Sequence, residues 1–192
     1  MSYLLKKTLI TLLSPMAAGY NKLDALRHLW AHARLNSALG GTVDASVVVL
    51  STPEIHGTKQ ISLGKNLYLY RELYLETQEQ GHIHIGNDVV LSRGVHIVAY
   101  SEIIIEDGVM IGEYSSLRDA NHLVVQDESV RHSGHSAKPI YIGKNAWLGR
   151  GVTVLGGVTI GAGAVIGANA VVTKNIPAGS VAVGIPAQVI KS

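Results

Sequence analysis

Aliphatic residues recur every six positions through the C-terminal third of the chain. A second set of small or branched residues follows the first by four positions. A period of six is a multiple of the two-residue strand repeat and does not fit the 3.6 residues of a helical turn, so the pattern predicts short β-strands. The leading set is Ile142, Leu148, Val154, Ile160, Ile166 and Val172, and the following set is Ala146, Val152, Val158, Ala164, Ala170 and Ile176.

The same spacing continues upstream with breaks of phase. Each break predicts a loop or bulge at a corner, and the largest gap separates Leu123 from Ile142 and contains the polar stretch QDESVRHSGHSAK. One six-residue unit cannot bury a core, whereas stacked units can. We therefore expect an all-β domain over residues 41–192, a parallel solenoid with a loop insertion near 124–138. The upstream runs are Val49, Ile55 and Ile61; Leu63, Leu69 and Leu75; Ile85, Leu91 and Ile97; and Ile105, Ile111, Leu117 and Leu123.

Residues 1–40 have a different pattern and predict a short helical region. The run LLKKTLITLLSPMAAGY imitates a secretory signal but is too short to span a membrane. As a helix it gathers one apolar face, and a second helical stretch, LDALRHLWAHARL, follows. Two interpretations stay open: a helical cap packed on protein, which most amphipathic helices favour, or a basic surface that contacts an anionic membrane. The apolar face consists of Leu5, Leu9, Leu12, Leu13 and Met16.

Composition narrows the function classes. The chain has 21 glycines and no phenylalanine, which indicates an aliphatic core with many tight turns. A net charge of +2 without a dense basic tract argues against nucleic acid as a partner. The absence of cysteine excludes disulfides, thiolate metal sites and a cysteine nucleophile.

The run IGKNAWLGRGVTVLGGVTIGAGAVIGANAVVTKNIPAGSVAVGIPAQVIK resembles the hexapeptide-repeat acyltransferases, with the ending NIPAGSVAVGIPAQVI specific to the group that O-acetylates galactosides, maltose and the sugars of capsule and lipopolysaccharide. The resemblance is strong over 105–191, weaker over 43–104 and absent over the first 40 residues. It implies a left-handed parallel β-helix, a homotrimer with active sites between subunits, acetyl-CoA as acyl donor and no metal. It also implies a cytoplasmic protein, either free or at the inner face of the membrane.

The sequence DANH, residues 119–122, stands where the repeat is interrupted. His122 matches the family's catalytic histidine, and a neutral imidazole can take the proton of an attacking hydroxyl, which contributes about 10²–10⁴-fold. Asp119 is predicted to orient the imidazole, although stabilising the turn is an equally ordinary role, and Asp127 and Glu128 are also near. Asn121 and His135 are predicted to contact the acceptor, His132 is undecided, and five other histidines are expected to be structural or solvated: His28, His32, His82, His84 and His96.

The resemblance also implies the residues that hold coenzyme A. Trp147, Arg150 and Ala168 match positions beside the pantetheine arm, and Thr173, Lys174 and Lys191 match positions near the adenosine phosphates. Two departures stand out. Gly94 occupies the place of an asparagine associated with the acetyl group, and Gln188 replaces a basic residue.

The sequence thus predicts an acetyl-CoA-dependent O-acetyltransferase that acts on a sugar hydroxyl of a surface polysaccharide or glycan precursor. N-acetylation of a sugar-nucleotide amine on the same scaffold is the nearest alternative. A non-catalytic solenoid is a further one. A carbonic anhydrase-like metal site ranks below these, because neither position five residues from His122 holds a histidine.

Overall fold

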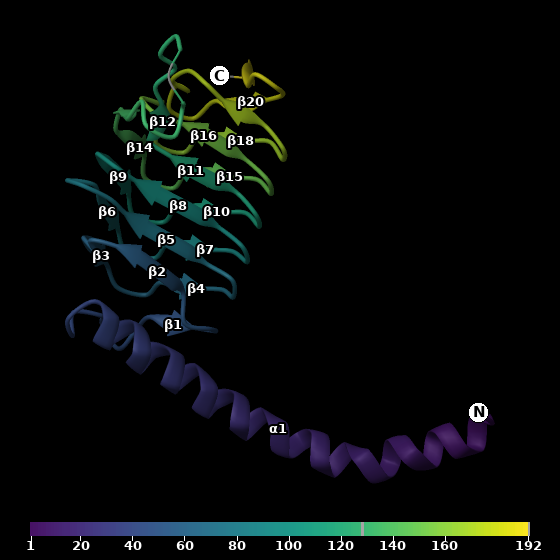
Figure 1. Ribbon diagram of the computed structural model, residues 1–192. Coiled ribbons are helices and arrows are strands. Elements are labelled where there is room, and N and C mark those ends of the chain that lie inside the picture. Colours follow the sequence, from purple (N-terminus) through teal and green to yellow (C-terminus); the bar gives the residue numbers. More distant parts are fainter. Residues whose placement is uncertain (128, 192) are drawn as a thin grey trace.

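The protein consists of one long helix and a β-solenoid whose coils are stacked above it (Figure 1). This computed structural model describes residues 1–127 and 129–191, with the side chains of 18–22 left undescribed. Each coil passes through three parallel sheets, which we name A, B and C in the order in which the chain visits them. The bends between them are the AB, BC and CA corners.

Sheet A runs the full height of the solenoid and ends in one antiparallel strand. Its strands are β1 (Val48–Val49), β4 (Tyr68–Leu69), β7 (Val90–Leu91), β10 (Met110–Ile111), β15 (Trp147–Leu148), β18 (Val165–Ile166), β20 (Val181–Val183) and the antiparallel β21 (Gln188–Lys191).

Sheets B and C complete each coil. Sheet B contains β2 (Glu54–Gly57), β5 (Tyr74–Thr77), β8 (His96–Ala99), β11 (Ser116–Arg118), β16 (Thr153–Leu155) and β19 (Val171–Val172). Sheet C contains β3 (Ile61–Leu63), β6 (His82–Ile85), β9 (Glu102–Ile105), β14 (Ile140–Ile142) and β17 (Thr159–Ile160).

The six-residue period predicts the core of the last coils correctly. Every member of both aliphatic sets is buried, with at most 4% of its surface exposed. The glycines that follow the leading residues lie where successive coils touch: a Cβ on Gly149 would lie 2.8 Å from the backbone nitrogen of Ala168. The parallel solenoid expected from the sequence is confirmed, while the hand of its coil remains an expectation from the resemblance.

The predicted interruption is an antiparallel hairpin at the BC corner. The chain leaves the fourth coil after Ala120, which is fully buried, and returns at Ile140. Strands β12 (Ala120–His122) and β13 (His135–Ala137) pair with each other, and we call residues 120–137 the BC hairpin. The prediction that Leu123 points into the core is wrong: the hairpin carries it outward and leaves it 42% exposed.

The N-terminal region is one helix, α1 (Tyr3–Ala38), and the expectation of two separate helical stretches is wrong. Pro15 lies inside it, and the hydroxyls of Thr8, Thr11 and Ser14 donate to carbonyls one turn back. The C-terminal half crosses the first coil, and the N-terminal half extends beyond the solenoid (Figure 1). Among the described residues, no helix is both long and apolar enough to cross a membrane.

Candidate functional site

The BC hairpin places the predicted base on the surface of the protein. In β12 and β13, His122 pairs with His135, and their rings lie 4.3 Å apart between centroids with a 43° tilt. The other side of His135 faces the Tyr100 ring at 4.6 Å. His122 and Asn121 are exposed, while His135 is half-buried between the two rings. The hairpin therefore pairs His122 with His135, adds Tyr100 on the other side of His135, and leaves Asn121 exposed next to His122 in β12.

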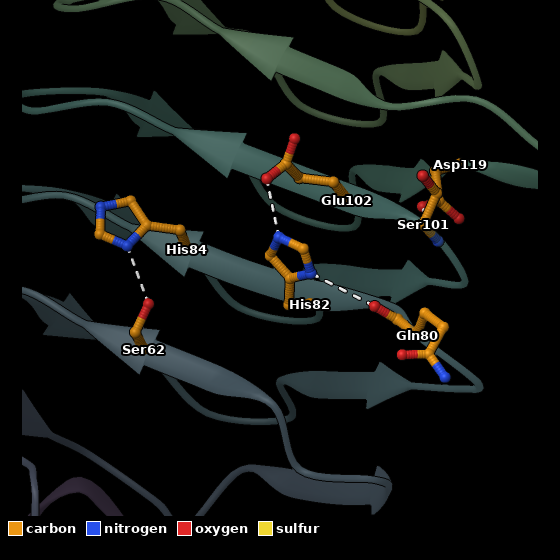
Figure 2. A network of polar contacts seen from close by, with 7 residues as sticks. All are labelled: Ser62, Gln80, His82, His84, Ser101, Glu102 and Asp119. Carbon is orange, nitrogen blue, oxygen red and sulfur yellow. Dashed lines mark hydrogen bonds and ion pairs between the residues drawn. The ribbon is translucent and has the colours of Figure 1, made fainter.

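Asp119 fixes the corner from which the hairpin leaves. Its carboxylate is buried and accepts two backbone hydrogen bonds, from the N–H of Tyr100 at 2.8 Å and from that of Ser101 at 2.7 Å. Figure 2 shows Asp119 beside Ser101, next to the strand that carries Glu102. Both carboxylate oxygens thus bind the previous coil, which supports the turn-stabilising role of Asp119. Its orienting role on His122 stays a prediction, and Glu128 lies outside the described residues.

His82, away from the hairpin, has a carboxylate partner of the kind that often orients a general base. On the outer face of sheet C, Nε2 of His82 lies 2.7 Å from a carboxylate oxygen of Glu102, and Nδ1 lies 3.3 Å from the carbonyl of Gln80 (Figure 2). These hydrogen bonds, that of Gln80 first, raise the pKa of His82. His84 pairs with Ser62 at 2.8 Å. The strands do point these histidines outward, but the His82–Glu102 pair was not predicted. Adding one coil of 20 residues to position 82 would have found it.

The outer face of sheet B carries a stack of rings that sequence analysis also missed. Tyr74 lies between His56, at 5.0 Å, and His96, at 4.4 Å, one ring from each of three successive coils. The Tyr74 hydroxyl donates to Glu76 at 2.5 Å, and this bond raises the pKa of Tyr74 to about 12. Burial lowers the pKa of His96, with a further contribution from Arg118. This ladder joins the first three coils and ends one coil before the coil that bears the hairpin.

The residues predicted for the pantetheine arm lie on sheet A and at the AB corner. Trp147 is 54% exposed on the outer face of β15. At the AB corner of the same coil, the guanidinium carbon of Arg150 lies 5.7 Å from the centre of the Tyr114 ring, within the range of a cation–π contact. Ala168 is exposed at the same corner one coil further on, where the Asn169 N–H donates to the carbonyl of Arg150.

The residues predicted for the adenosine phosphates divide between two places. Thr173 and Lys174 are exposed directly after β19, at the BC corner that also carries the hairpin. Lys191 is exposed on β21, paired with Val181 at the end of sheet A. Sheet B therefore separates the predicted residues of one chain into an AB group (Trp147, Arg150, Ala168, with Lys191 nearby) and a BC group (Asn121, His122, His135, Thr173, Lys174). One chain alone does not bring the two groups together.

Gly94 stands where the resemblance places an asparagine, and the structure shows what surrounds it. It lies at the AB corner with a φ of +71°, in the left-handed region that glycine adopts without strain. A Cβ there would lie 2.4 Å from the Tyr114 ring. Tyr114 fills this space and packs under Arg150, so a larger side chain at position 94 would displace the Tyr114 ring.

No group of three or more His, Cys, Asp or Glu side chains is arranged to hold a metal ion within residues 1–127 and 129–191. Histidines and carboxylates on the outer faces of the sheets occur instead in pairs and stacks.

Comparison with known proteins connects this geometry with a family. Residues 139–174 match the family model described as "Bacterial transferase hexapeptide (six repeats)". A "Probable acetyltransferase" of Mycobacterium tuberculosis is 35% identical over 148 residues, 72% of this chain and 47% of that protein. The galactoside O-acetyltransferase of Escherichia coli is 35% identical over 131 residues, 68% of this chain and 63% of that protein.

A solved structure of galactoside acetyltransferase in complex with coenzyme A shares the fold, with a TM-score of 0.56 and 25% identity, covering 84% of this chain and 80% of that chain. The chain spans about half the length of the first curated relative and less than two thirds of the second. Repeat, relatives and fold agree: the chain belongs to the hexapeptide-repeat acyltransferases.

Proposed function

We propose that the protein is an acetyl-CoA-dependent O-acetyltransferase that acts on a sugar hydroxyl of a surface polysaccharide or glycan precursor. The observation that carries the proposal is His122, exposed on a hairpin that interrupts a hexapeptide solenoid. The similarity to a galactoside O-acetyltransferase and to a coenzyme A complex supports the donor and the acceptor class. We place the enzyme in the cytoplasm, where acetyl-CoA is made.

The proposed reaction needs one proton acceptor and no covalent enzyme intermediate. The imidazole of His122 removes the proton of the sugar hydroxyl while its oxygen attacks the thioester carbonyl. The tetrahedral intermediate then collapses, the carbon–sulfur bond breaks, and the imidazolium returns the proton to the leaving thiolate. The acetyl ester and coenzyme A leave together with the base restored. In this proposal His135, which itself packs against the Tyr100 ring, limits the freedom of the His122 ring through their tilted ring contact.

We further propose that a homotrimer completes the site. The outer face of sheet A carries one apolar side chain per coil in unbroken register, and such a column favours contact with protein. In a cyclic trimer the interface is heterologous, so that sheet A of one chain faces a different surface of the next. Placing the BC group of one chain against the AB group of its neighbour would unite the two halves of the site. The column consists of Val48, Tyr68, Val90, Met110, Trp147, Val165 and Val181.

N-acetylation of a sugar-nucleotide amine is the second candidate, because the same base could take a proton from the neutral amine nitrogen as that nitrogen attacks the thioester carbonyl. Offering matched hydroxyl and amino acceptors to one preparation would separate the two reactions. Calorimetric titration with acetyl-CoA separates both from a non-catalytic solenoid, which would give no binding heat.

Histidine variants test the assignment of the base. We expect His122→Ala to lower kcat by about 10²–10⁴-fold with little change in the KM for acetyl-CoA. His82→Ala is the decisive companion, since His82 has a carboxylate partner and would be the base if orientation alone selected it. His84→Ala is the matched control on the same strand. Loss of turnover in His82→Ala with near-normal turnover in His122→Ala would overturn the proposal.

A further inference from the structure

Helix α1 carries more exposed large apolar side chains than any other element in the described part of the chain. Most of its large apolar side chains are exposed, and among the side chains of the helix that the structure describes only Ala31 and Leu35 are buried. Its N-terminal half extends away from the solenoid, at the end opposite the BC hairpin and β20 (Figure 1). The exposed apolar residues are Tyr3, Leu4, Leu5, Leu9, Ile10, Leu12, Leu13, Met16, Leu23, Leu26, Leu29 and Trp30.

The part of α1 that crosses the first coil has two distinct faces. Ala31 and Leu35 pack against the solenoid, and Nδ1 of His32 lies 3.0 Å from the carbonyl of Val47. Leu26 and Trp30, 62% and 68% exposed, lie roughly 140° around the helix from that buried face, as 3.6 residues per turn require. Leu26 and Trp30 therefore form an apolar stripe outside the contact between α1 and the solenoid, where another surface could meet it.

The net charge of residues 1–40 indicates which kind of surface α1 would meet. Residues 1–40 contain five of the 16 Lys and Arg residues and one of the 14 Asp and Glu residues, a net charge of +4. The remaining 11 basic and 13 acidic residues leave the solenoid with −2. The helix is thus both apolar and basic. An anionic surface would attract the helix and repel the solenoid, which has a net negative charge. This combination is typical of helices that lie in the interface of an anionic bilayer.

We propose that α1 is an interfacial anchor that lies along an anionic lipid bilayer and holds the solenoid with its first coil toward the membrane. The apolar stripe enters the boundary between headgroups and acyl chains, while lysine and arginine side chains contact the lipid phosphates. A second copy of the chain is a less favourable occupant, because helices with a net charge of +4 repel each other. Anchoring requires no catalytic step, so its test is independent of the proposed function.

Vesicle binding by the full-length protein tests the charge. We expect sedimentation with vesicles of phosphatidylglycerol and phosphatidylcholine, and none with phosphatidylcholine alone. Replacing Lys6 and Lys7 by Gln should weaken binding roughly 30-fold, from about 1 kcal/mol per cation and 1.4 kcal/mol per tenfold change. The control, Lys59→Gln with Lys65→Gln, removes the same charge from the solenoid and should bind like the wild type. Equal binding to both vesicle types, or equal loss in both variants, would overturn the proposal.

Fluorescence of Trp30 tests the orientation of the stripe. In a Trp147→Phe background Trp30 is the remaining tryptophan of the two, and anionic vesicles should shift its emission to the blue. Leu12→Glu with Leu26→Glu should abolish both shift and sedimentation without unfolding the protein, because both leucines are more than 60% exposed. Absence of a shift with anionic vesicles would refute the anchor. So would a concentration-dependent shift without lipid, which would mean that a second copy covers the stripe.

Discussion

Asp119 offers the sharpest test of how the BC hairpin is held. Its two oxygens accept the N–H groups of Tyr100 and Ser101 in a buried position, and hydrogen bonds to a charged acceptor contribute about 1.5–3 kcal/mol each. Asp119→Asn keeps the volume but turns an amide NH₂ toward one of the two donors. We therefore expect the free energy of unfolding to fall by about 2–3 kcal/mol.

Urea denaturation at a fixed protein concentration measures this loss, and Asp127→Asn is the matched control. Asp127 is exposed in the same hairpin, and its replacement should stay within about 0.5 kcal/mol of the wild type. An Asp119→Asn protein as stable as the wild type would refute the structural role. If that stable variant also lost turnover, the carboxylate would instead orient His122, as the sequence alone suggested.

Two further predictions concern Gly94 and His82. Restoring the family's asparagine through Gly94→Asn should lower the free energy of unfolding by about 1–3 kcal/mol, because the new Cβ meets the Tyr114 ring at 2.4 Å. Thermal unfolding measures this loss, and an unchanged melting temperature would contradict the packing argument. For His82, hydrogen bonds to Gln80 and Glu102 raise the pKa above its unfolded value, so its stabilisation is complete below about pH 6.5 and disappears as pH rises through the folded pKa. The stability difference between wild type and His82→Gln is at most about 1 kcal/mol for so exposed a pair, and it should shrink as the pH rises above about 6.5. A difference that grows with pH would contradict the sign.

The sequence predicts the solenoid well because burial in it is strictly periodic. Leu148 and Val154 differ by six positions and both point inward, as does every residue of the two aliphatic sets. The prediction fails at Leu123 because the six-residue spacing continues in the sequence to this residue although the backbone has already left the coil. An aliphatic residue at the expected spacing does not indicate whether its strand pairs with the neighbouring coil or, as here, with β13.

The candidate site is predictable only in part, because its contacts join residues one coil apart. The resemblance supplies His122, and local sequence brings Asn121 beside it. The partners of Asp119 lie 18 and 19 residues upstream, and the Tyr100 ring that meets His135 lies 35 positions away. Such contacts depend on coil length, which varies with the insertions at the BC corner. The continuity of α1 was equally hidden, since Pro15 normally marks a helix end.

The central claim is that His122 of one chain works with the AB group of another. Co-assembly of two inactive proteins tests it most directly: His122→Ala, and Trp147→Ala combined with Arg150→Ala. Random mixing leaves an intact pair at about a quarter of the interfaces of a cyclic trimer, so specific activity should return to about a quarter of the wild-type value. If the mixture forms trimers and stays as inactive as its parents, the two groups do not meet across chains and the account is wrong.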